Sequence, residues 1–129
     1  MPTRPNSNFA CATKAKDLIA YIYSITDAIP RKYKFNIWQK IQNNALEVLE
    51  SLIMANEIMI GVTPEDNKER RNLQHKALAK LKVIDSLILI ARECECIVPK
   101  KYEVISRLVS DCANLTGAWI NSDKKRIQK

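Results

Sequence analysis

The residues best suited to metal binding are the four cysteines and the single histidine of this 129-residue chain. Cys94 and Cys96 stand two positions apart in a helical stretch, so their side chains point to nearly opposite faces. His75 lies about five helical turns earlier, too far for a shared zinc site. We therefore expect no metal and no cofactor, and interpret the thiols, with Cys11 and Cys112, as small apolar residues in a reducing compartment.

Catalytic groups are equally hard to find around His75. A nucleophile needs an adjacent base and an oxyanion site, and the Asn, Arg and Lys side chains near His75 offer neither. No Glu stands three positions before a His, which excludes the di-iron pattern of some helical bundles. Gly61 and Gly117, the two glycines, provide no phosphate-cradling loop and no dinucleotide fingerprint. We predict that the chain is not an enzyme; the alternative is an unrecognised site at a subunit interface.

Positive charge is the clearest functional signal. The formal net charge is +7 at pH 7, and it is segregated along the chain: positions 1–40 are basic, 41–69 acidic, and 70–101 and the C-terminal end basic again. Segregation of this kind favours a surface that attracts polyanions on one side only. The candidate nucleic-acid-binding residues form three clusters: Arg31, Lys32 and Lys34; Arg71, Lys76 and Lys80; Lys124, Lys125 and Arg126.

Each cluster has a simpler interpretation as well. Solvated helix faces need charge, and long basic side chains cover apolar surface. Arg70 and Lys82 are further basic residues expected on the surface of the same predicted helix. Acidic residues could pair with Lys76 and Lys80 and so neutralise their charges; the candidates are Asp66, Glu69 and Glu103. Three clusters together with the net charge nevertheless favour binding of RNA or DNA through phosphate contacts, with weak sequence preference.

Four aromatic residues are alternative candidates for stacking on bases. Tyr33 and Tyr102 lie at predicted helix ends, where a tyrosine commonly covers the edge of the core. Trp38 and Trp119 fall on predicted inner faces of helices. We therefore expect the tyrosines to pack on the core, and the tryptophans to lie in the core or in a subunit contact.

The elements that must position these residues are four helices. Apolar residues alternate gaps of three and four from about 13 to 29, 37 to 60, 64 to 96 and 99 to 120. Pro30, Gly61 and Pro99 separate the segments, and Thr63-Pro64 is a typical helix start. The clearest inner face belongs to the second helix and consists of Trp38, Ile41, Ala45, Val48, Leu52, Ala55 and Met59, widened by Ile37, Leu46, Leu49, Ile53 and Ile60.

Short connections between four helices permit only an antiparallel up-down-up-down bundle, so the predicted fold class is all-α. We expect one domain over residues 1–129, with a polar leader at 1–12 and a basic tail at 121–129. The sequence has neither an apolar run of the ~20 residues that cross a bilayer nor the hydrophobic stretch of a signal peptide. We therefore expect no membrane association and a cytoplasmic protein.

Three short stretches of the chain stand out by their order and spacing. They are Leu18-Ile19-Ala20-Tyr21-Ile22-Tyr23 running into Ile29-Pro30-Arg31-Lys32, then Pro99-Lys100-Lys101-Tyr102-Glu103, and Gly117-Ala118-Trp119-Ile120. Together they resemble one known family, the accessory variability determinants (Avd) of diversity-generating retroelements. The last stretch is the most specific, and the resemblance covers roughly residues 14–122. A sister family, encoded by intervening sequences in bacterial large-subunit rRNA, carries Asn-Ile-Ala-Glu-Gly late in helix two, where positions 54–61 here differ.

The resemblance implies a homopentamer of four-helix protomers that binds nucleic acid and the reverse transcriptase of the element. Such a complex copies a template RNA into adenine-mutagenised cDNA, with this chain as the non-catalytic partner. The family often repeats a Leu-Arg pair along helix three; Leu81-Lys82 matches the first, but Asp85-Ser86 replaces the second. The alternative is an rRNA-associated or freestanding four-helix module for RNA or protein interaction, and a neighbouring reverse transcriptase gene would distinguish the two.

Overall fold

The computed structural model describes residues 7–128, which contain helices and connecting segments and no strand. The four long helices are α1 (Ser7–Ser24), α3 (Ile37–Glu57), α4 (Pro64–Glu93) and α5 (Pro99–Ile127). A 3₁₀ turn, η1 (Thr26–Ala28), and a one-turn helix, α2 (Arg31–Lys34), connect α1 to α3. The all-α prediction is confirmed.

The helix starts follow from local hydrogen bonding. Thr63 caps α4, because its hydroxyl accepts a hydrogen bond of 3.0 Å from the Asp66 amide, and Pro64 occupies the first position, where no amide hydrogen is needed. Gly61 adopts a positive φ of 82° in the preceding loop, a conformation that favours glycine. The carboxamide of Asn36 caps α3 by accepting from the Ile37 amide at 2.6 Å.

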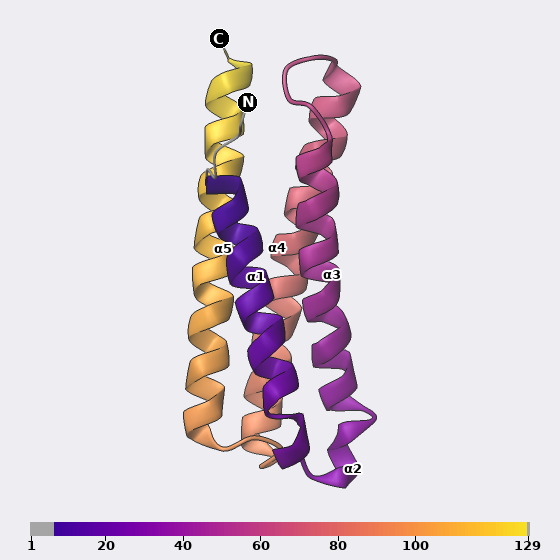
Figure 1. The fold of residues 1–129 in the computed structure, drawn as a ribbon, viewed down its shortest axis with the longest axis vertical. Helices are drawn as coiled ribbons and strands as arrows, with labels where there is room; N and C mark the ends of the chain where they lie inside the picture. Colours follow the sequence, from indigo (N-terminus) through magenta and orange to yellow (C-terminus); the bar gives the residue numbers. More distant parts are fainter. Residues whose placement is uncertain (1–6, 129) are drawn as a thin grey trace.

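The long helices form a four-helix bundle in which α1 and α4 each pack against both α3 and α5. Figure 1 shows that successive long helices run in opposite directions, and the contacts agree: Lys80 of α4 meets Glu47 within α3, while Arg70, earlier in α4, meets Ile58, just past the end of α3. Most residues of the predicted inner faces are buried, with Trp38 and Trp119 almost fully enclosed, but Leu46 and Ile53, predicted to widen the inner face of α3, are 43% and 46% exposed. Tyr33 and Tyr102 are partly buried against the core, as expected.

Helix boundaries depart from the prediction at five places, one of which is the end of α4 at Glu93 instead of about position 96. α1 begins at Ser7, so part of the predicted polar leader is helical and Cys11 is buried; residues 1–6 lie outside the described residues. The turn at 31–34 is helical, and α5 continues to Ile127 because the buried Asp123 anchors its last turns, so most of the predicted tail is helix. Conversely, α3 ends at Glu57, and Met59 is 70% exposed in the following loop instead of facing the core.

None of the four cysteines, all of which lie within the described residues, forms a disulfide. Cys94 is exposed at the end of α4, whereas Cys11, Cys96 and Cys112 are buried. Burial raises the pKa of Cys96 to about 11 and that of Cys112 to about 12, with a further contribution from the neighbouring cysteine in each case.

These environments predict the reactivity of the thiols. Only the thiolate reacts rapidly with an aromatic disulfide reagent, and access is required as well. We expect one thiol, Cys94, to be modified quickly in the native protein at mildly alkaline pH, and all four after denaturation. Rapid modification of two or more thiols in the native protein would contradict the described packing; mass spectrometry of the peptides identifies the modified positions.

Candidate nucleic-acid interface

The nine predicted basic residues do not form one surface. Arg31, Lys32 and Lys34 belong to α2, at the lower end of the bundle in Figure 1, whereas Lys124, Lys125 and Arg126 lie at the opposite end of α5. α5 has 29 residues, which at about 1.5 Å per residue corresponds to a length of about 43 Å. The two ends are therefore separate candidate sites.

At the lower end, α2 is held against the end of α4. The Tyr33 hydroxyl donates a hydrogen bond of 3.1 Å to the Cys94 carbonyl, and the side chain of Asn36 donates one of 2.8 Å to the Lys32 carbonyl. The Lys32 ammonium lies 5.1 Å from the centre of the Tyr33 ring, within cation–π range. Arg31 and Lys32 are exposed and Lys34 is partly buried. The backbone of this cluster is thus fixed while its charges remain in solvent.

The same end receives basic residues that the sequence did not single out. Lys101 lines a small hollow of about 90 Å³ with Pro30 and Glu95, which places the start of α5 beside α2. Arg92, at the end of α4, lies 5.1 Å from the Tyr102 ring. We define the α2 basic end as the cations gathered here: Arg31, Lys32, Lys34, Arg92, Lys100 and Lys101.

The start of α5 adds to the positive potential of the α2 basic end. The first turn of α5 contains no acidic residue, and Val98 at its N-cap makes no side-chain capping hydrogen bond. The helix dipole places partial positive charge at this terminus, where acids would normally be favoured, yet Lys100 and Lys101 occupy it. This reversal of the usual pattern is the sequence signal that could have identified the two lysines. Together with α2 they offer a surface suited to phosphate groups.

At the upper end, Arg71 joins the C-terminal cluster. Arg71 and Lys124 line one hollow of about 260 Å³ together with Ile127 and Gln128. Lys125 and Arg126 are exposed, and a guanidinium nitrogen of Arg126 lies 3.9 Å from a carboxylate oxygen of Asp123. The structure therefore associates Arg71 with α5 and not with Lys76 and Lys80, the residues with which it was grouped by sequence.

Lys76 and Lys80 occupy the flank of α4 that faces α3. The Lys80 ammonium lies 2.8 Å from a carboxylate oxygen of Glu47, and the Lys80 side chain is only 30% exposed. The hydrogen bond and charge of Lys80, followed by the charges of Lys76 and Lys40, lower the pKa of Glu47. Neutralisation comes from this acid of α3, not from the acids that the sequence suggested. This flank is consequently the least favourable of the three clusters for an added phosphate.

The prediction that Arg70 lies on the surface of its helix is wrong, because the residue is only 4% exposed. Its guanidinium makes two hydrogen bonds to the Asp123 carboxylate, at 2.8 and 3.0 Å, and a third of 2.8 Å to the Ile58 carbonyl. Gln74 donates to the same carboxylate at 2.9 Å, and the Arg70 guanidinium lies 5.0 Å from the Trp119 ring. This buried network joins the end of α3 to α4 and α5.

The described residues contain no group of three or more His, Cys, Asp or Glu side chains that could hold a metal ion. His75 is exposed. Among the helices of residues 7–128, none combines the length and the apolar character needed to span a bilayer.

Comparison with known proteins identifies the family. The sequence profile of the bAvd-like family matches residues 9–123, which take in most of α1, the α2 connection, α3, α4 and most of α5. No curated protein matches the chain. Because the match covers most of the sequence, the chain belongs to the bAvd-like family, and its all-helical fold is consistent with an Avd-type accessory protein.

Proposed function

We propose that the chain is the non-catalytic accessory protein of a diversity-generating retroelement. It binds nucleic acid and the reverse transcriptase of the element, and thereby supports synthesis of mutagenised cDNA. The family match over residues 9–123 is the observation that carries this proposal. The net charge of +7 and the basic clusters at the two ends of the bundle support a polyanionic ligand.

The α2 basic end is the proposed phosphate-binding surface. It brings six cations from three helices to one end of the bundle, two of them in the first turn of α5, where the helix dipole adds to their potential. Phosphate contacts carry no sequence information, so RNA, DNA and their hybrids bind with weak sequence preference and strong salt dependence. The cluster around Arg71 and Lys124 is the secondary candidate.

The proposed protein partners are the reverse transcriptase and further copies of this chain, in a cytoplasmic complex. The family resemblance implies a homopentamer. Exposed apolar side chains on α3 and α4, such as Ile53 at 46% and Ile90 at 50% exposure, support association with protein.

The proposal predicts that a reverse transcriptase gene and paired template and variable repeats lie beside the gene for this chain. We expect the tagged chain to co-purify with that polymerase, and cDNA with substitutions at template adenines to form only when both proteins are present. Sequencing of the cDNA measures this. A polymerase that neither binds the chain nor changes its products on addition of the chain would contradict the retroelement role, even if the chain binds RNA.

A further inference from the structure

The second half of α4 is apolar on its outer face as well as on its inner face. From Val83 to Ala91 the only charged residue is Asp85. Ile84 and Ile88 are fully buried, yet Val83 and Ile90 are 41% and 50% exposed on the other side of the helix. A helix that is apolar all round is normally buried. This outer face therefore calls for a partner that the single bundle does not provide.

We define the α4 strip as Ala79, Val83, Ser86 and Ile90, which are all exposed. These positions recur at gaps of three and four, so they form one line along the helix. Part of the strip borders a hollow of about 390 Å³ that is also lined by Lys82. Lys82 in turn borders a groove of about 290 Å³ between α4 and α5. The strip and the groove therefore lie on either side of Lys82.

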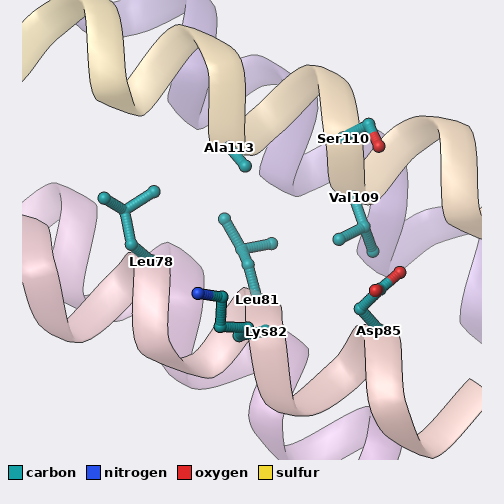
Figure 2. Close-up of a pocket in the computed structure, with 7 residues that line it drawn as sticks. All are labelled: Leu78, Leu81, Lys82, Asp85, Val109, Ser110 and Ala113. Carbon is teal, nitrogen blue, oxygen red and sulfur yellow. The ribbon is translucent and has the colours of Figure 1, made fainter.

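Figure 2 shows the groove between α4 and α5, with Leu78 and Leu81 projecting from α4 toward Val109 and Ala113 on α5. Lys82 and Asp85 lie at its α4 edge. Among the described residues, neither Lys82 nor Asp85 forms an ion pair, that is, has an oppositely charged group within 4.0 Å; the ion pairs of the bundle join other residues. The edge of the groove thus offers charges that remain available to a partner.

α3 carries a second apolar strip on a different face. We define the α3 strip as Leu46 and Ile53, which are 43% and 46% exposed and lie seven positions apart, on one side of the helix. Glu47 marks the side of α3 that meets α4, through its ion pair with Lys80. Successive helical residues are rotated by about 100°, so Leu46 and Ile53 fall on the opposite flank from Glu47, toward α1. The two strips therefore face different directions on the same bundle.

The two strips have the same length, and the charges that flank them have opposite signs. Leu46 to Ile53 and Val83 to Ile90 both span about 10.5 Å along a helix. Exposed acids, Glu50 and Glu57, flank the α3 strip, whereas exposed lysines, Lys76 and Lys82, flank the α4 strip.

We infer that the α3 strip of one copy docks on the α4 strip of the next copy, with Glu50 and Glu57 near Lys76 and Lys82. The two halves of the contact belong to different faces of one protomer, so association is head-to-tail and closes into a ring when the rotation permits. A second copy of the chain is the partner that fits, because the acids beside the α3 strip can pair with the lysines beside the α4 strip. The inference rests on the proposed homo-oligomer and refines it by assigning its two faces.

Two double variants test the assignment. One carries Val83→Glu and Ile90→Glu on the α4 strip; the other carries Leu46→Glu and Ile53→Glu on the α3 strip. Each variant retains one intact face, so each alone should have the protomer mass of 14.8 kDa by light scattering. An equimolar mixture should form a heterodimer of twice that mass and grow no further. The matched control is Met59→Glu with Val62→Glu, which are 70% and 61% exposed outside both strips and should keep the parental mass.

The outcomes separate this inference from the proposed assembly. Variants that keep the parental oligomer mass overturn the assigned faces while leaving the homo-oligomer intact. Monomeric variants that do not form a heterodimer when mixed overturn head-to-tail docking. A parent chain with a mass near 14.8 kDa overturns the homo-oligomer itself. Circular dichroism checks that each variant is folded, and the milder Val83→Ser with Ile90→Ser replaces the Glu pair if helicity is lost.

Discussion

Replacing Asp123 with alanine should lower the free energy of unfolding by about 3 to 5 kcal/mol, the usual effect of removing one partner of a buried ion pair. The side chains of Arg70 and Asp123 are only 5% and 6% exposed. Without the carboxylate, the guanidinium stays buried with no counterion, and Gln74 loses an acceptor. Because the network also includes the Ile58 carbonyl, the loop between α3 and α4 should loosen with the end of α5.

Urea denaturation monitored by circular dichroism measures this effect, and two variants serve as controls. Asp111→Ala removes a carboxylate whose pair with Lys14 spans 3.7 Å and is about 40% exposed, so its effect should stay below about 1 kcal/mol. Arg70→Met combined with Asp123→Leu removes both charges and should recover most of the lost stability. A loss below about 1 kcal/mol for Asp123→Ala would contradict the role given to this network.

The network also shows what sequence patterns can and cannot reveal. The helices are predictable because apolar residues recur at fixed gaps, as in Ala77, Leu81, Ile84 and Ile88. Arg70 and Gln74 continue the same register toward the helix start, which indicates an inward direction, but arginine and glutamine are typical of solvated positions. Their burial depends on Asp123, which follows Arg70 by 53 positions on another helix. Only the three-dimensional arrangement shows that the charges compensate.

The candidate nucleic-acid interface, like the buried network, could be predicted only in part from the sequence. Arg31, Lys32 and Lys34 could be selected from composition alone. Their proximity to Lys101 arises from the packing of the α1–α3 connection against the start of α5, a contact between segments about 70 positions apart. The ion pair of Lys80 with Glu47 likewise depends on the register of α3 against α4. Local periodicity determines which way a residue faces on its helix, but not which residue of the next helix it meets.

Replacing Arg31, Lys32, Lys100 and Lys101 together by glutamine should weaken binding of single-stranded RNA on the order of 10² to 10³-fold at about 0.1 M salt. Four lost phosphate contacts should also make the slope of log affinity against log salt shallower by about 3. These side chains are exposed or only partly buried, so helicity and oligomer mass should not change. Fluorescence anisotropy with a labelled oligonucleotide measures both quantities.

The matched control neutralises positive charge at another place. Lys80→Gln removes the cation whose charge Glu47 already neutralises, so affinity and salt slope should stay close to those of the parent. A third variant, with Arg71, Lys124, Lys125 and Arg126 replaced by glutamine, tests the upper end. If only this third variant weakened binding, the interface would lie at the C-terminal end of α5 and the assignment of the α2 basic end would be wrong.

The most direct test of the central claim is the affinity of the purified parent chain for short RNAs of unrelated sequence between about 50 and 200 mM salt. Phosphate contacts release counterions, so log affinity should fall linearly with log salt, by a similar amount for every sequence. We expect tight binding at the lowest salt concentration and a steep, sequence-independent decline. Absence of binding at about 50 mM salt, affinity that does not change with salt, or loss of binding after a single base change would contradict a phosphate-binding accessory protein.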